Sequence, residues 1–472
     1  MRPQDVAITP SDGAREPLLA SSEASAAAKA ASDIYWTKTC CFGVMTLVSM
    51  SYQFSEAPLL QLYENAICRE FHTPGGRPKM FAEENRCETN SIRVQKELAS
   101  ITAIQVNLDT IIALVASVYM PSLLRTWGIR RMLQLNLIFH MAGQLWIYLM
   151  LGYRIFPVKL TWASSVTLAI ASGPYMRLEM IFMILALVTP EDDRFETFTL
   201  GQMVVLVPDF LAKQSAAFLM ERGIWLPLAL GIACLTLAIV ALFWNMPTEP
   251  AGEQTTGSAL KPANIRTQFV LTVQVLLLSP AIFFLIMTFS FTNVFGQLMS
   301  GSTLLQVLKR KFGMSLGDAS VIQSFSNLVS LPPLAVMYFF LRGWDTLHVC
   351  CVCAACMMIG LLLIGVAQSW IFVIAGFIFC ATGQGFRMAA RSELSLTKNV
   401  PKEDLPRLYI LIFYMDMVGG GLFNAWVLAH AFNEGLDDGG MSLGLPLFVA
   451  VAEWFIVALI AISIQFLRNR PS

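Results

Sequence analysis

Charged residues are scarce in this sequence of 472 residues, at 14% of the chain against 56% hydrophobic residues. Soluble domains carry about 25% charged residues, so the composition excludes an ordinary soluble protein and indicates a membrane protein. The mean hydropathy of +0.61 agrees with this interpretation. Acidic and basic residues balance at 32 each, and no basic block is present that would favour binding to nucleic acid.

Residues typical of enzyme active sites are also few. The four histidines are scattered and show no metal-ligand spacing such as HExxH. Neither a phosphate-binding Gly-rich loop nor a GxSxG nucleophile motif occurs. The sequence therefore predicts neither an enzyme nor a bound metal or other cofactor.

Long apolar runs, by contrast, are numerous. A membrane-crossing helix needs about 20 mostly apolar residues. We expect twelve such helices, near residues 38–60, 98–120, 132–152, 160–188, 196–220, 224–246, 267–295, 319–341, 346–367, 370–396, 407–431 and 445–467. A polar linker over 247–266 separates them into an N-terminal bundle over 34–246 and a C-terminal bundle over 267–472. Residues 1–33 lack an apolar core and predict a disordered cytosolic tail.

The Lys and Arg residues of the short loops favour a cytosolic position for both chain ends. The cluster Lys309–Lys311 then falls outside, and the segment 304–314 around it is expected to lie flat in the outer interface. The first outside loop, over 61–97, contains Cys68 and Cys87. In an oxidising compartment these two cysteines would form a disulfide, the alternative being two free thiols.

Two short segments repeat one another. Residues 171–177, "ASGPYMR", share the frame A-(S/T)-G-x-x-(M/F)-R with residues 381–387, "ATGQGFR", 210 positions later. The following turns, "VTPEDDR" (188–194) and "VPKEDLPR" (400–407), are also alike. A parallel repeat of two six-helix halves is the organisation of major facilitator transporters. We therefore expect an all-α membrane protein with twelve transmembrane helices in two pseudo-symmetric bundles.

Each repeat ends on an arginine within an apolar run, where a charge costs about 2.5–3.5 kcal/mol on insertion scales. Counted from the hairpin turns at about 1.5 Å per residue, Arg177 lies at the depth of Asp209, and Arg387 lies at the depth of Asp416. We therefore predict the ion pairs Arg177–Asp209 and Arg387–Asp416. Lys213, four residues after Asp209, is the alternative partner of that carboxylate.

Further charges are candidates for substrate binding or ion coupling. Asp109 lies near the middle of the second expected span. Glu56 lies near the outer end of the first, where a helix-end carboxylate in water is the alternative interpretation. Glu179 lies closer to the cytosol in the fourth span and has no obvious partner. Arg391 and Glu393 approach the cytosolic mouth and are expected to be gate or interface charges.

The loop between the second and third spans reads "MPSLLRTWGIRRML" (120–133). It resembles the signature of the major facilitator superfamily, which carries Gly, then Asp-Arg, then Gly-Arg-Arg. Gly128, Arg130 and Arg131 fit this pattern. Arg125 stands where the family has Asp, so the loop departs from the usual charge relay of the cytosolic gate.

More specifically, the chain resembles a group of fungal members often encoded beside secondary-metabolite genes, which are distantly similar to proton-coupled folate transporters. The resemblance extends over roughly residues 34–467. It is carried by Asp109 and by "EAPLLQLYENAICREF" (56–71), "KRKFGMS" (309–315), "GQGFRMAARSELS" (383–395) and "GLPLFVA" (444–450).

Together these features predict a secondary active transporter that moves a small organic solute by alternating access. Export of a fungal secondary metabolite, coupled to protons through Asp109, Asp209 or Asp416, is the first interpretation, and proton-coupled nutrient uptake is the alternative. A non-transporting receptor or scaffold is the alternative from another class, although it usually brings a sizeable soluble domain. We expect a monomer in the plasma membrane, with the vacuolar or endosomal membrane as the alternative.

Overall fold

The computed structural model is built almost entirely of helices. It describes residues 16–72, 92–117, 119–153, 156–171, 173–190, 193–245, 280–300, 302–340, 344–396, 405–438 and 440–468. Long apolar helices suit a membrane, because a helix satisfies its backbone hydrogen bonds within itself.

The N-terminal half packs its helices around α1. Its elements are α1 (Glu16–His72), α2 (Ile92–Ser117), α3 (Met120–Gly152), the 3-10 helix η3 (Val158–Thr167), α4 (Leu168–Ala171), α5 (Gly173–Val188), α6 (Arg194–Met220) and α7 (Trp225–Asn245). Within this half α1 packs against α5, α6 and α7, and α3 packs against η3, α4 and α5.

The C-terminal half packs α12 against α13 and α16. Its elements are α9 (Pro280–Ser300), α10 (Ser302–Phe312), α11 (Leu316–Phe340), α12 (Thr346–Val366), α13 (Trp370–Leu396), α14 (Leu405–Asp416), the π-helix η6 (Met417–Asn424), α15 (Ala425–Asp438), the 3-10 helix η7 (Gly440–Gly444) and α16 (Leu445–Arg468).

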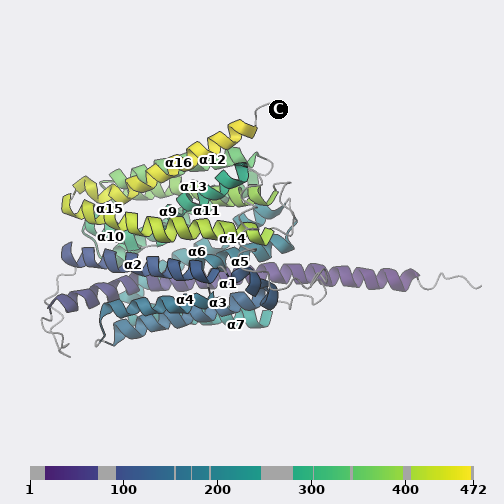
Figure 1. The fold of residues 1–472 in the computed structure, drawn as a ribbon, viewed down its shortest axis with the longest axis horizontal. Helices are drawn as coiled ribbons and strands as arrows, with labels where there is room; N and C mark the ends of the chain where they lie inside the picture. Colours follow the sequence, from purple (N-terminus) through teal and green to yellow (C-terminus); the bar gives the residue numbers. More distant parts are fainter. Residues whose placement is uncertain are drawn as a thin grey trace, which may run out of the picture.

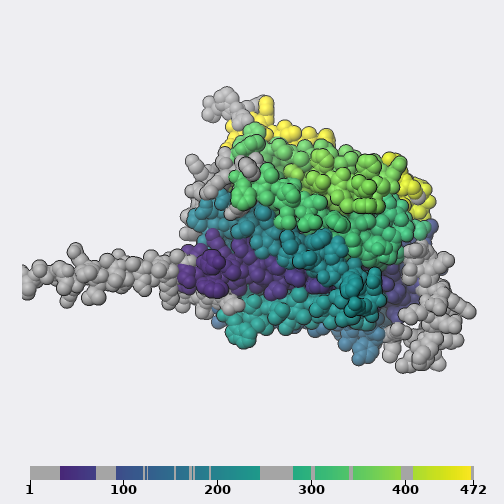
Figure 2. Space-filling model, turned by 180° about the vertical axis from the view of Figure 1, so that it is seen from behind, coloured from purple at the N-terminus to yellow at the C-terminus, as the bar shows by residue number. Residues whose placement is uncertain are grey.

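The two halves lie one above the other as two layers of roughly parallel helices (Figure 1). From behind, the green-to-yellow C-terminal half covers the purple-to-teal N-terminal half along its length (Figure 2). The contacts between the halves join α6 to α11, α2 to α15 and η6, and α5 to α14. Helices α10 and α15 mark one end of the molecule, here called the α10 end. The opposite end, where α16 finishes, is called the C-terminal end (Figure 1).

Ten helices within the described residues are long and apolar enough to cross a membrane. The remaining two expected spans fall on other elements: residues 38–60 lie within α1, and residues 160–188 are divided among η3, α4 and α5. The seventh expected span begins outside the described residues, which resume at Pro280 with α9.

The prediction of one continuous helix over 160–188 is wrong. Residues 158–167 form a 3-10 helix, and α5 begins only at Gly173, whose backbone has a φ of 76°. This left-handed conformation costs an L side chain energy but suits glycine, and Asn136 Nδ2 donates to the Gly173 carbonyl at 2.9 Å. The broken span leaves room for polar side chains inside the N-terminal half.

The expected disordered tail is also corrected in part, because α1 begins at Glu16. Residues 1–15 and the expected linker over 247–266 lie outside the described residues. Cys68 is buried and disulfide-bonded, whereas its predicted partner Cys87 lies outside the described residues.

We expect Cys68→Ser to lower the unfolding temperature by several degrees in a fluorescence-monitored melt. A native disulfide typically stabilises by about 2–4 kcal/mol, largely by restricting the unfolded chain. Cys234→Ser is the matched control, because Cys234 is a half-buried free thiol and its replacement should leave the melt unchanged. Equal unfolding temperatures for Cys68→Ser and the parent protein would contradict a stabilising disulfide.

Candidate functional site between the two halves

The predicted pair of the second repeat is in contact. Arg387 Nη2, from α13, donates to Asp416 Oδ2, at the end of α14, at 2.5 Å. Asn293 of α9 completes the group: its Oδ1 accepts from Arg387 Nη1 at 3.4 Å, and its Nδ2 donates to the Asp416 carbonyl at 2.9 Å. Only 1% of the Asp416 side chain is exposed. Three elements of the C-terminal half thus converge on the buried residue Asp416.

A second arginine on α13 joins this group to the N-terminal half. Arg391 Nη2 donates to Glu179 Oε1 of α5, and Asp416 Oδ2 lies 4.0 Å from the same nitrogen. Both partners are buried, at 1% and 2% exposure. A buried charge is tolerated when it is paired and is very costly when it is alone. Glu179 therefore has a partner that its own half does not supply.

Two aromatic rings enclose these arginines. The Arg391 guanidinium lies 4.8 Å from the ring centre of Phe182 on α5 and 5.3 Å from that of Phe289 on α9. Arg387 lies 5.6 Å from the Phe289 ring. Such cation–π contacts gain strength where water is excluded. The four charges and two rings form a compact cluster that bridges the halves, here called the central cluster.

The predicted pair Arg177–Asp209 is wrong. Arg177 is 4% exposed, and no ion-pair or hydrogen-bond partner for it occurs in the described part of the chain. Asp209 Oδ2 instead accepts from Ser49 Oγ at 2.7 Å and from Gln53 Nε2 at 3.1 Å, both on α1. Equal depth did not imply equal rotation about the helix axes.

The alternative pairing of Lys213 with Asp209 is wrong as well. Lys213 Nζ lies 3.0 Å from Glu56 Oε2, and both side chains are nearly inaccessible. Gln323 of α11 donates to Glu56 Oε1 at 3.5 Å. Glu56 is therefore a buried ion-pair partner at the contact with the C-terminal half, and not a helix-end carboxylate in water.

Asp109 lies in a polar group of a different kind, within the N-terminal half. Its Oδ1 accepts from Ser165 Oγ at 2.5 Å and from Gln105 Nε2 at 2.9 Å. Gln105 Nε2 also lies 3.1 Å from Ser164 Oγ. Both serines belong to η3, so the broken fourth span supplies these contacts. Among the described residues Asp109 has neutral partners only.

At the α10 end a buried ion pair also joins the halves. Lys309 Nζ, from α10, lies 2.8 and 2.9 Å from the two carboxylate oxygens of Glu64 on α1, and Gln95 Nε2 donates to Glu64 at 2.8 Å. A more exposed pair, Lys96–Asp437, lies nearby at 2.6 Å. The prediction that this basic segment lies flat in the interface is wrong for Lys309, which points into the protein.

Sequence reasoning did not select Glu64 or Lys309 as site residues. Both lie in segments that carry the family resemblance, 56–71 and 309–315, which was the available signal. The ion pairs Glu179–Arg391 and Glu64–Lys309 both join the two halves. They lie at different depths along the helices, the second at the α10 end. Ion pairs therefore join the two halves toward both ends of the molecule.

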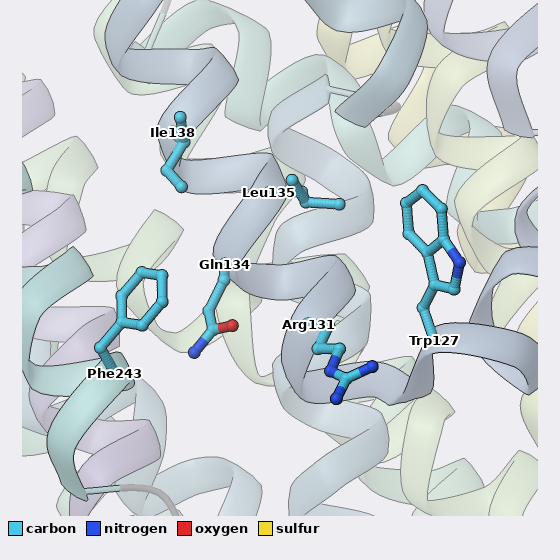
Figure 3. Close-up of a pocket in the computed structure, with 6 residues that line it drawn as sticks. All are labelled: Trp127, Arg131, Gln134, Leu135, Ile138 and Phe243. Carbon is cyan, nitrogen blue, oxygen red and sulfur yellow. The ribbon is translucent and has the colours of Figure 1, made fainter.

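The loop motif lies apart from these clusters, where α3 begins. Gly128 has a φ of 77° and interrupts α3. Arg130 Nη2 donates to the Phe243 carbonyl of α7 at 2.8 Å, which ties the two helices together. Arg131 is exposed and lines a groove between the same helices (Figure 3).

Solved structures identify this arrangement of helices. A proton:xylose symporter of the major facilitator superfamily superposes with a TM-score of 0.61, at 13% identity, over 91% of this chain and 95% of its own. The chain has the major facilitator fold. With this fold and ten apolar helices among its described residues, it is a multi-pass membrane protein.

Relatives that the chain matches in sequence come from fungi. The MFS efflux pump atnC of Emericella nidulans is 24% identical over 434 residues, which cover 87% of this chain and 84% of that protein. The MFS-type transporter aprT of Aspergillus flavus is 22% identical over 498 residues, covering 98% and 95%. No family model matches the chain. The chain thus resembles fungal major facilitator transporters.

The major facilitator fold gives the clusters a physical meaning. Rigid halves of such proteins rock about a site near the membrane middle. An ion pair that spans the halves must break when its end of the molecule opens, whereas a pair within one half can persist. Glu179–Arg391 and Glu64–Lys309 are of the first kind, and Arg387–Asp416 is of the second.

Proposed function

We propose that this protein is a secondary active transporter that exports a small organic metabolite of a fungus by alternating access. The observation that carries the proposal is the buried pair Glu179–Arg391 at the contact of two rigid halves. The name of the relative atnC, an MFS efflux pump, supports export as the direction. Buried ion pairs are a poor way to stabilise a fold, but they suit a contact that must form and break in each cycle.

In this mechanism the closed structure is an intermediate between two open ones. Breaking Glu64–Lys309 opens the α10 end, which we take as the outer face, while Glu179–Arg391 holds the cytosolic side shut. Breaking Glu179–Arg391 opens the cytosolic side while the outer pair holds. The solute would occupy the space between the halves beside the central cluster, where Arg387 and Asn293 offer hydrogen-bond donors.

Proton coupling is the finer part of the proposal. Asp109 receives hydrogen bonds from neutral groups only, so it can take up a proton without breaking an ion pair. Asp416 faces two arginines and would be protonated only after Arg391 has moved away. Asp109 is therefore our candidate for the proton carrier. Asp416 is our candidate for a group whose protonation depends on the relative position of the two halves.

We expect Asp109→Asn to abolish the pH dependence of transport while leaving the protein folded. Asparagine keeps the size of the side chain and still accepts from Gln105 and Ser165, but it cannot carry the proton. Counterflow of labelled substrate in proteoliposomes, measured at two pH values, checks this. Asp318→Asn is the matched control, because Asp318 also accepts from a serine hydroxyl, Ser315 Oγ at 2.7 Å, but is exposed near the start of α11, and its variant should keep the pH dependence. A parent-like pH profile for Asp109→Asn would contradict the assignment.

Export itself is tested in the native fungus by deleting the gene and comparing metabolites in the cells and in the medium. We expect at least one metabolite to accumulate in the cells and to decline in the medium. The opposite change, loss of a nutrient from the cells, would favour uptake. The location of a fluorescently tagged protein would test the prediction of the plasma membrane. The mass of the protein–detergent complex would test the prediction that the protein is a monomer.

A further inference from the structure

A groove of about 310 Å³ opens between α3 and α7, away from the contact of the two halves. Side chains from both helices surround an open space (Figure 3). They are Trp127, Arg131, Gln134, Leu135, Ile138 and Phe243. Neither the central cluster nor the ion pair at the α10 end involves any of these residues, so the transport mechanism leaves the groove unexplained.

Aromatic residues place this groove at the level of the lipid headgroups. Trp127 is 46% exposed, Phe243 is 51% exposed, and the neighbouring Trp244 is 82% exposed. Tryptophans on the outside of a membrane protein concentrate at the interface between hydrocarbon and water. The groove therefore lies where α3 enters the membrane and α7 leaves it.

The residues of α3 in the groove change character along the helix. Positions 131, 135 and 138 share one face of the helix that follows the break at Gly128, because they are spaced by three or four residues, and Trp127 lies immediately before that break. Going into the membrane, the groove presents the interfacial Trp127, then Arg131, and then the apolar Leu135 and Ile138. A phospholipid has the same order, with an anionic phosphate above and hydrocarbon below.

Arg131 is the charged side chain of this helix face that is available to bind a ligand. Its neighbour Arg130 is occupied by the Phe243 carbonyl at 2.8 Å. Arg131, by contrast, is exposed and makes no ion pair or hydrogen bond within the described ranges. Arginine binds phosphate with several N–H groups at once. The groove therefore combines an apolar wall with a cation that can bind a phosphate.

We propose that this groove binds one anionic phospholipid, with the headgroup phosphate on Arg131 and an acyl chain along Leu135, Ile138 and Phe243. The bound lipid would fill the space between α3 and α7 beside the Arg130 contact. It would thereby steady the N-terminal half while the halves move relative to one another. Given the expected orientation of the chain, the lipid comes from the cytosolic leaflet.

The test is native mass spectrometry of the full-length protein titrated with phosphatidylserine. We expect the parent protein to retain one molecule more tightly than the rest. Arg131→Gln should weaken this binding about fivefold, in line with the attraction of a single interfacial cation. Arg131→Lys should keep most of the binding. Ile138→Trp should weaken it by filling the groove although the charge remains.

The matched control is Arg222→Gln. Arg222 is also exposed and lies 4.8 Å from the ring of Phe218, but it comes after α6 and outside the groove. Its variant should bind like the parent. Equal binding by the parent and Arg131→Gln, or equal losses for Arg131→Gln and Arg222→Gln, would overturn the proposal. Melts in phosphatidylcholine nanodiscs would show that each variant is folded.

Discussion

Replacing Arg391 with glutamine should abolish transport and lower the unfolding temperature of the protein markedly. The substitution leaves the Glu179 carboxylate buried at 2% exposure without its partner. Removing one member of a buried ion pair typically costs about 3–5 kcal/mol. Counterflow in proteoliposomes measures the first effect, and a melt in detergent measures the second. No other single charge change described here should destabilise the protein as much.

The double variant Glu179→Gln/Arg391→Gln separates stability from function. Two amides can hydrogen-bond in place of the ion pair, and no unpaired charge remains, since Asp416 keeps Arg387. We expect the unfolding temperature to return close to that of the parent. Transport should recover only in part, because the electrostatic contact that closes the cytosolic side is missing.

Arg468→Gln is the control for loss of an arginine at this end of the molecule. Arg468 is half exposed and bridges Asp345 at 3.2 Å and Glu393 at 3.4 Å, both within the C-terminal half. Surface pairs contribute about 0–1 kcal/mol, so this variant should resemble the parent. If Arg391→Gln transported normally, the pair Glu179–Arg391 would have no role in the cycle.

The ion pair of the C-terminal repeat was predicted correctly and that of the N-terminal repeat was not. The difference lies in the direction in which the side chains point around their helix axes. Counting residues from a turn gives the depth of a side chain but not the direction in which it points. Arg387 and Asp416 share both depth and face, so the predicted contact is present. Arg177 and Asp209 share depth alone, because Asp209 turns toward Ser49 on α1.

Contacts between the halves were harder to predict than contacts within them. An organisation in two bundles and an internal repeat were predicted from the sequence. Neither indicates which face of one bundle meets the other. Glu179 therefore had no visible partner, although Arg391 was expected to be a gate or interface charge. Lys309 was expected in the outer interface, whereas its ammonium group contacts Glu64 inside the protein.

Local irregularities also escaped the search for apolar runs. Window averages detect hydrophobic length, so the runs over 160–188 and 407–431 both suggested continuous α-helices. The first is broken before Gly173, and the second contains the π-helix η6. The signal for the second was the sequence Gly419–Gly421, since three successive glycines weaken an α-helix by about 1 kcal/mol each. π-Helical segments often occur at functional sites.

Glycine at 421 lets the two halves touch, and Gly421→Ala should therefore abolish transport. A methyl group at this position would collide with Thr110 of α2, coming within 2.6 Å of its Cγ2 and 2.7 Å of its Cβ. Thr110 is 2% exposed and its hydroxyl already donates to the Val106 carbonyl, so it has little freedom to move. The contact of η6 with α2 would be forced apart, and the closed state would be lost.

Truncating the opposing side chain should reverse this effect in proportion to the space released. Thr110→Ala removes Cγ2 and the hydroxyl but leaves Cβ, so the double variant Gly421→Ala/Thr110→Ala should recover part of the transport activity. The double variant Gly421→Ala/Thr110→Gly also removes Cβ and should recover more of it. Gly419→Ala provides the contrast, because its methyl group would meet the Ser290 backbone, which no side-chain truncation can remove. Gly43→Ala is the control in open space and should transport normally. Wild-type transport by Gly421→Ala would mean that the halves need not approach this closely during the cycle.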